Sequence, residues 1–141
     1  MSPDFDFDRF YRTVVREAPD AVIFVDGAGI IRFWNAGAER IFGFSETEAT
    51  GKSLDIIIPQ DLRERHWSGF RESMRTGKTR YGAGHTLAVQ ALRKDGRPIS
   101  VEFSMLPLRG DDGAIRGIAA ILRDVRERVG VSGAHSDWMN L

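Results

Sequence analysis

The sequence predicts an α+β domain in which a five-stranded antiparallel sheet carries helices on one face. Strand-like segments form two groups, two near the start and three near the end, and segments with helical periodicity lie between them. Short turns rich in glycine and aspartate join neighbouring strand-like segments, which favours antiparallel pairing. With 141 residues, of which 42% are apolar, the chain is long enough for one domain with a sizeable core.

The clearest strand covers residues 98–108, where apolar and polar side chains alternate strictly. Residues 115–125 are almost all apolar, so we expect a central strand that is covered on both faces. The remaining strands are expected at residues 21–25, at 30–34 and from about 84 to 92. The core-facing residues of the alternating strand are expected to be Ile99, Val101, Phe103 and Met105.

Helices are expected between the two groups of strands. Asn35 is a good N-cap for a helix that Gly43 ends, and Ser45 opens a short helical turn. The longest helix is expected at residues 59–77, with proline at its first position and glycine just past its end. Its inward face is expected to consist of Leu62, His66, Gly69, Phe70 and Ser73.

Composition excludes several classes of function. Twenty basic and twenty acidic residues cancel, which argues against sequence-independent binding to nucleic acid. The chain has no cysteine, so disulfides, thiolate metal sites and thiol-attached chromophores are excluded. No apolar run is long enough to span a membrane, and the start lacks a signal-peptide pattern. Because a membrane span and a signal-peptide pattern are lacking, we expect a cytoplasmic protein. The serines fall on strands or at helix caps, so we do not expect an enzyme.

Residues 1–18 are expected to form an amphipathic helix that ends before Pro19. Its apolar face either covers the open face of the sheet in the same chain or packs against its twin in a homodimer, and we favour the homodimer. Residues 19–128 then form the main domain, and residues 129–141, which show no period, form a flexible tail. The apolar face of the helix is made by Phe7, Phe10, Tyr11, Val14 and Val15.

This order of elements resembles the PAS family. The matching segments read APDAVIFVD, WNAGAERIFGFSETEATGKSL, MRTGKTR, ALRKDGRPISVEFSMLPL and GIAAILRDVRER, and together they span about residues 18–128. The resemblance implies a sensory or protein-interaction module with a partner or effector that the sequence does not name. The chain departs from the family at Asp124-Val125-Arg126, where many PAS domains carry a threonine that takes part in signalling.

The long helix is similar to that of the heme PAS domains of rhizobial oxygen-sensor kinases. The similarity lies in Arg65-His66, Phe70, the helix end MRTG and the following RKDG. It implies heme b as the cofactor and His66 as the iron ligand, because neutral imidazole binds heme iron and leaves its opposite side open. Arg80, together with Arg63, could pair with the heme propionates. The apolar wall would comprise Leu62, Phe70, Leu87, Val101, Phe103 and Met105.

Two alternatives stay open at this point. The oxygen sensors place an arginine where this chain has Thr86 or Leu87, and the adjacent His85 could be a second ligand, a donor to bound oxygen or a solvent-facing residue. His66 could instead be a structural imidazole that is hydrogen-bonded to a carbonyl group or to Glu64 or Asp61. In that case the protein is a ligand-free PAS interaction module whose core is filled by its own side chains, or a sensor of another small apolar ligand.

Overall fold

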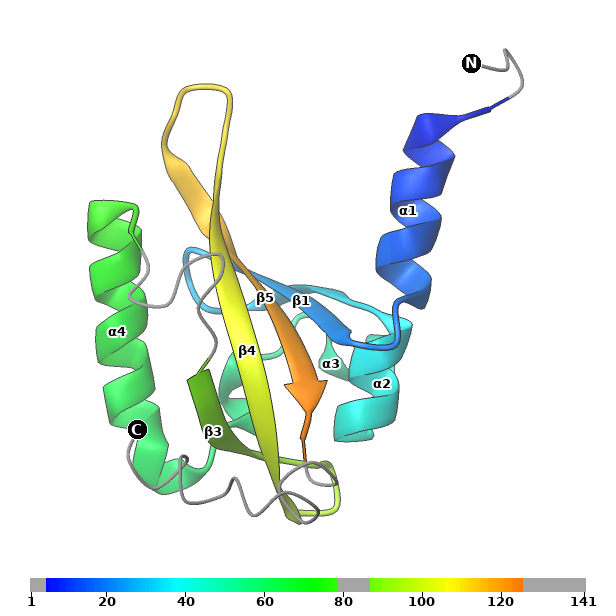
Figure 1. The fold of residues 1–141 in the computed structure, drawn as a ribbon. Coiled ribbons are helices and arrows are strands. Elements are labelled where there is room, and N and C mark those ends of the chain that lie inside the picture. The colour runs from blue at the N-terminus through cyan, green and yellow to red at the C-terminus, as the bar shows by residue number, and fades with distance from the viewer. Residues whose placement is uncertain (1–4, 79–86, 126–141) are drawn as a thin grey trace.

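The structure, a computed structural model, describes residues 5–78 and 87–125. Its elements follow the expected order, with a five-stranded antiparallel sheet, helices α2 to α4 on one face, and α1 standing apart from the sheet (Figure 1). They are α1 (Phe7–Glu17), β1 (Ala21–Asp26), β2 (Ile31–Trp34), α2 (Ala36–Phe42), α3 (Glu46–Ala49), the 3₁₀ turns η1 (Leu54–Ile57) and η2 (Gln60–Leu62), α4 (Arg63–Thr76), β3 (Leu87–Leu92), β4 (Pro98–Arg109) and β5 (Ile115–Asp124).

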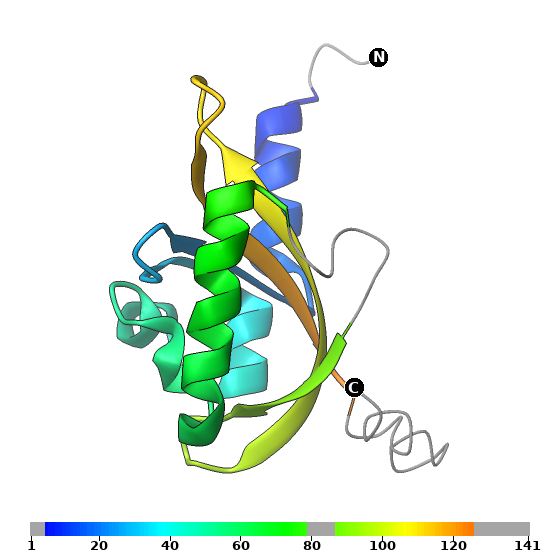
Figure 2. The same cartoon turned by 90° about the vertical axis from the view of Figure 1, so that its left-hand side faces the viewer.

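The strand order β2-β1-β5-β4-β3 places β5 at the centre of the sheet, as its apolar sequence predicts. The expectation that β5 is covered on both faces is wrong. Ile121 keeps 39% of its surface exposed, because the described helices do not lie across the face of the sheet to which it belongs. Figure 2 shows this arrangement from the side, with the sheet curving around α4.

The core lies between the sheet and the helices on its concave face. Ile99 and Val101 of β4 are buried there, while Phe103 and Met105 are half-buried and pack against the same cluster, so the predicted alternation is confirmed. Helix α2 begins at Asn35, whose side chain accepts from the Ala38 N–H, and ends at Gly43 in the left-handed conformation. The largest fully buried side chains are Trp34, Phe42, Ile23, Ile31 and Val101.

The long helix differs from the prediction at its start and on its inward face. Pro59 precedes the turn η2, and regular α-helix begins only at Arg63; the end at Gly77, with φ of 74°, is as predicted. Gly69 does not face inward, because a Cβ atom built on it would meet nothing within 4 Å. With 100° of rotation per residue, Gly69 lies at one edge of the predicted inward face. The part of the helix that packs against the core is centred closer to Phe70 and Met74.

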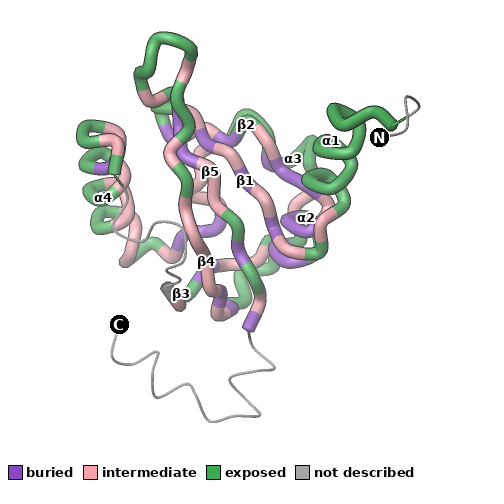
Figure 3. Tube along the Cα trace, turned by 45° about the horizontal axis from the view of Figure 1, so that its top comes forward, coloured by how far each residue is buried: buried purple, intermediate pink, exposed green. Residues whose placement is uncertain are grey.

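Helix α1 confirms the helical prediction but does not cover its own sheet. None of its residues is buried, and Figure 3 shows it exposed along its whole length. Its last turn alone is tied to the domain. The Asn35 side chain donates to the Val15 carbonyl at 2.8 Å, and the Arg16 guanidinium lies 5.4 Å from the centre of the Phe33 ring. The interpretation of α1 as a cap on its own chain is therefore wrong.

Candidate functional site

The first half of α4 is fastened to the turn that precedes it. The indole N–H of Trp67 donates to the Asp55 carboxylate at 2.6 Å. The guanidinium of Arg63 donates to the carbonyl groups of Ile58 and Asp55 at 3.1 and 3.2 Å. A Cβ atom at Gly29 would come within 2.4 Å of the Trp67 ring, so the indole lies directly on the β1–β2 turn. These contacts fix the first half of α4, which carries His66 on its inner side.

His66 is held between aromatic rings on this helix. Its ring meets the Trp67 ring edge-on, with centroids 4.5 Å apart, and lies nearly parallel to the Phe70 ring at 6.4 Å. Its Nδ1 atom is buried and has no hydrogen-bond partner among residues 5–78 and 87–125. The alternative in which a carbonyl, Glu64 or Asp61 holds this imidazole is therefore not supported at Nδ1. Both acidic residues are exposed and leave that nitrogen unpartnered.

Burial lowers the pKa of His66 below its ordinary value, and the nearby Asp55 carboxylate opposes that effect only in part. The imidazole is therefore neutral at pH 7, and a ring nitrogen keeps its lone pair. A buried polar atom without a partner costs free energy, which a ligand bound to it would recover. The neutral form is also the form of histidine that binds metal ions.

The other predicted site residues differ in burial, and some of them lie outside the described part of the chain. Leu62 of η2 and Phe70 of α4, with Phe103 and Met105 of β4, are half-buried and pack against the core. Val101 is fully buried within the core cluster, and its place in the pocket wall stays a prediction. Leu87 opens β3 opposite Phe103 in the strand register. Arg80, His85 and Thr86 lie outside the described residues.

Arg63, which is predicted to contact a heme propionate, is engaged with the preceding turn. Its guanidinium is already bonded to the two carbonyl groups of the preceding turn and lies 3.9 Å from the Asp55 carboxylate. Sequence reasoning missed the residues that position His66, namely Trp67 and Asp55. The sequence gives little indication of their role. Neither residue belongs to the predicted inward face of the long helix, and their contact joins two separate elements twelve positions apart.

The described residues fit a heme group in two respects: His66 offers a nitrogen ligand, and the side chains around it are apolar. They contain no cluster of three or more histidine, aspartate and glutamate side chains that could hold a metal ion by themselves. A porphyrin supplies four nitrogen ligands of its own, so a single neutral imidazole is enough to complete the protein's side of such a site. Phe70 of α4 and Phe103 and Met105 of β4 are half-buried apolar residues that pack against the same core.

The comparison with protein families settles the class of domain. The model of the family described as the PAS fold matches residues 15–130 of the chain. This chain belongs to the PAS family. Of the described helices, none has the length and apolar character needed to cross a membrane.

Curated relatives of this PAS domain include two named sensors. The sensor protein FixL of Bradyrhizobium diazoefficiens is 36% identical over 94 residues, which cover 67% of this chain and 18% of FixL. The oxygen sensor protein DosP of Escherichia coli is 33% identical over 75 residues, which cover 53% of this chain and 9% of DosP. The PAS domain thus spans less than a fifth of these two relatives.

Solved structures confirm the PAS fold at lower sequence identity. A PAS domain of a protein from Colwellia psychrerythraea has a TM-score of 0.76 and 24% identity, with 87% of this chain and 100% of that chain covered. An RNA-binding light-oxygen-voltage receptor has a TM-score of 0.74 and 19% identity, with 100% of this chain and 40% of that chain covered. At these identities the likeness concerns the fold alone.

Proposed function

We propose that this PAS domain is a non-enzymatic, cytoplasmic sensory module that binds heme b through His66 and signals through protein–protein contacts. The observation that carries the proposal is the buried, unpartnered Nδ1 atom of a neutral imidazole on α4. The sequence similarity of α4 to heme PAS domains of oxygen-sensor kinases supports it. So does the relationship to FixL and to DosP, which is named an oxygen sensor.

The chain's own residues would bind and orient the group. The contact between Trp67 and Asp55 fixes the first half of α4, and the rings on either side of His66 restrict the orientation of the imidazole. Phe70, Phe103 and Met105 would exclude water from the apolar part of the site. Heme iron bound by a neutral imidazole supplies a second axial position that can take a diatomic gas. Arg80, His85 and Leu87 remain predicted members of the site.

Signalling requires that the bound and free states differ in how the domain packs. The central strand β5 links the core face to the opposite face of the sheet, and it hydrogen-bonds to β1, which follows α1 directly. A small repacking of Phe103 or Met105 next to β5 would therefore shift β5 and change the open face of the sheet. We propose that α1 and this face carry the output.

Heme-dependent stabilisation tests the proposal, because a ligand that binds only the folded state raises its stability. Hemin in about hundredfold excess over its dissociation constant should add roughly 2.7 kcal/mol, which corresponds to a rise in Tm of several degrees. His66→Ala should abolish the rise, and His135→Ala, which removes a histidine with no assigned role, should retain it. Equal rises in all three proteins would show that hemin binds without His66.

A second candidate function is a ligand-free homodimeric interaction module. The exposed apolar face of α1 favours it, since a face of this kind is costly to leave in water. A ligand-free core excludes heme binding, whereas dimer formation is compatible with either function, so the two questions are tested by different measurements. Heme binding is tested at His66. Dimer formation is tested by light scattering on the unmodified chain, which should give twice the mass of 15.8 kDa, and on Phe10→Asp, which should give the mass of one chain.

A further inference from the structure

Helix α4 contacts the turn between β1 and β2 through two side chains next to its inner face (Figure 2). These are Trp67 and Met74, which are seven residues, and so two helical turns, apart. A Cβ atom at Gly29 would come within 2.4 Å of the Trp67 ring. One at Gly27 would come within 3.3 Å of the Met74 Cε atom. The turn is therefore in direct contact with the residue that follows His66.

The indole of Trp67 is held on other sides as well. Its N–H donates to the Asp55 carboxylate at 2.6 Å, and its ring meets the Phe70 ring edge-on, with centroids 5.1 Å apart. The carboxylate lies 3.9 Å from the Arg63 guanidinium, which also donates to the Asp55 carbonyl group. A charged acceptor makes the hydrogen bond from the indole stronger than a neutral acceptor would. The indole is therefore fixed in both position and orientation.

The orientation of the His66 imidazole depends on this indole. Among residues 5–78 and 87–125, the buried Nδ1 atom of His66 has no hydrogen-bond partner that could hold the ring. Of the two aromatic rings that it meets, the Trp67 ring is the closer, with centroids 4.5 Å apart against 6.4 Å for the Phe70 ring. Its edge-on contact with the indole is a preferred geometry for aromatic pairs. Contact with Trp67 therefore contributes more to the orientation of the imidazole than hydrogen bonding at Nδ1.

Histidines that bind metal ions are usually oriented by a hydrogen bond from their second ring nitrogen, and loss of that partner weakens metal binding. In this chain the indole of Trp67 can serve the same purpose, because it is the fixed group that the imidazole meets. The indole in turn depends on the Asp55 carboxylate and on the absence of a side chain at Gly29. The affinity of His66 for heme should thus respond to a change at either position.

We infer that Trp67 is a positioning residue that determines how tightly His66 binds heme. Asp55 and Gly29 contribute by holding the indole in place. The inference rests on the proposed function, since it concerns the iron ligand of the same site. It extends that site beyond its apolar wall to the turn between β1 and β2.

Hemin titration of Trp67→Phe tests the inference, because phenylalanine keeps an aromatic ring beside His66 and loses the N–H that binds Asp55. The affinity for hemin should fall about 10–100-fold relative to the unmodified chain, the usual effect of removing a group that orients a metal ligand. Asp55→Ala removes the same hydrogen bond and should weaken binding to a similar extent. Because the two residues act as one unit, the double variant should lose no more affinity than the weaker-binding single variant.

A measurement without heme reports on the imidazole itself. In the heme-free chain the His66 ring should give one sharp NMR signal, which is assigned by its loss in His66→Ala. This signal should shift or broaden in Trp67→Phe.

The two glycines of the turn provide a matched pair of variants. Gly29→Ala should shift the imidazole signal and weaken hemin binding, because a φ of 79° and the Trp67 ring both disfavour a side chain at this position. Gly27→Ala meets only the flexible end of Met74 and should leave the signal and the affinity unchanged. Equal effects of the two variants would contradict a specific role for the contact between Gly29 and Trp67.

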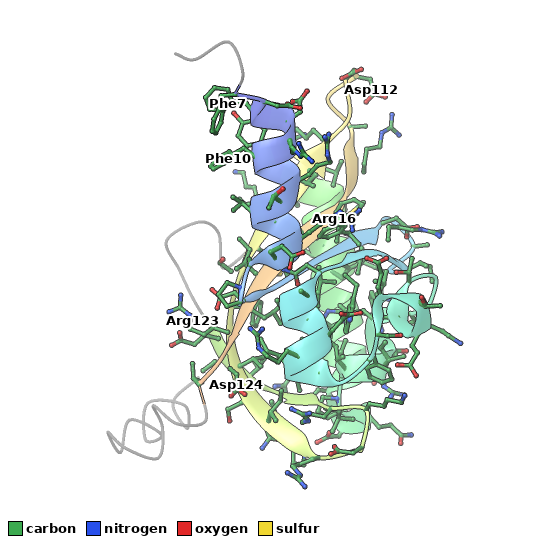
Figure 4. All side chains as sticks on the ribbon, turned by 90° about the vertical axis from the view of Figure 1, so that its right-hand side faces the viewer. Phe7, Phe10, Arg16, Asp112, Arg123 and Asp124 are labelled. Carbon is green, nitrogen blue, oxygen red and sulfur yellow. The ribbon has the colours of Figure 1, made fainter. Side chains whose placement is uncertain are left out.

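Gly37→Ala controls for a general loss of stability. Gly37 belongs to α2, which stands on the other side of the molecule from α4 (Figures 1 and 4). A Cβ atom there would come within 2.1 Å of the Asp20 carbonyl oxygen, so the variant should be less stable. It should nevertheless bind hemin with unchanged affinity at a temperature at which all the variants are folded.

The outcomes separate this inference from the proposed function. A hemin band that depends on His66 but has the same affinity in Trp67→Phe and Asp55→Ala would overturn the inference alone. Weakening of hemin binding in Gly37→Ala to the same extent would show that stability and not positioning is responsible, and would also overturn it. An unmodified chain without a hemin band that depends on His66 would overturn the proposed function, and the inference with it.

Discussion

Asn35 joins three elements through one buried amide. Its side-chain oxygen accepts from the Val22 N–H at 2.8 Å and from the Ala38 N–H at 2.9 Å, while its amide nitrogen donates to the Val15 carbonyl at 2.8 Å. Asn35→Ala would leave these groups unpaired and remove the N-cap of α2. We expect the free energy of unfolding to fall by about 2–4 kcal/mol, measured by urea denaturation.

Asn35→Asp provides the matched comparison, since it keeps the acceptor and loses the donor. It should retain the cap of α2 but place a carboxylate against the carbonyl group that ends α1. We therefore expect faster proteolysis of α1 in Asn35→Asp than in the unmodified chain. A fall of less than about 0.5 kcal/mol in Asn35→Ala would show that the amide network contributes little.

Asp26 gives the domain a predictable dependence on pH. Hydrogen bonds from Arg32, Ile30 and Ala28 lower the pKa of its carboxyl group, with the Arg32 bond as the largest cause. A carboxyl group whose pKa is lowered by folding stabilises the native state above its unfolded pKa of about 3.9 and loses that effect as pH falls. Asp26→Asn should therefore cost about 1 kcal/mol at pH 7 and much less near pH 3, measured by denaturation at both values. An equal cost at both values would contradict the assignment.

At the scale of elements, two helical glycines predict opposite effects. Gly69 of α4 is exposed with open space around it, so Gly69→Ala should raise the free energy of unfolding by about 0.5–1 kcal/mol through helix propensity. In α2, a Cβ atom at Gly37 would lie 2.1 Å from the Asp20 carbonyl oxygen, so Gly37→Ala should lower it by about 1–3 kcal/mol. Thermal unfolding of both variants checks the pair, and effects of the same sign would contradict these placements.

At the scale of the whole molecule, the sheet and the helix order could be predicted because their signals are local. The alternation in β4 and the caps at Asn35, Gly43 and Gly77 each depend on a few neighbouring residues. What could not be predicted depends on contacts between distant elements. The position of α1 is set by Asn35 and Arg16, and the exposure of Ile121 follows from it. Sequence periodicity shows that a helix has an apolar face but not which surface it meets.

The candidate site was predictable in part for the same reason. His66 could be singled out by sequence similarity, whereas its unpartnered Nδ1 atom and its position beside Trp67 required the structure. Val101 has the same strand periodicity as Phe103 and Met105, and only its full burial distinguishes it from them. A period of two residues assigns a side chain to a face of the sheet and does not show how deeply it is buried.

The most direct test of the account is a visible absorption titration with hemin on the unmodified chain, His66→Ala and His135→Ala. Coordination by one imidazole predicts a sharp Soret band that saturates at one heme per chain in the unmodified protein and in His135→Ala, and that is lost or shifted in His66→Ala. A weak, non-saturating band that is the same in all three proteins would contradict heme ligation by His66 and would favour the exposed apolar face of α1 as the functional surface.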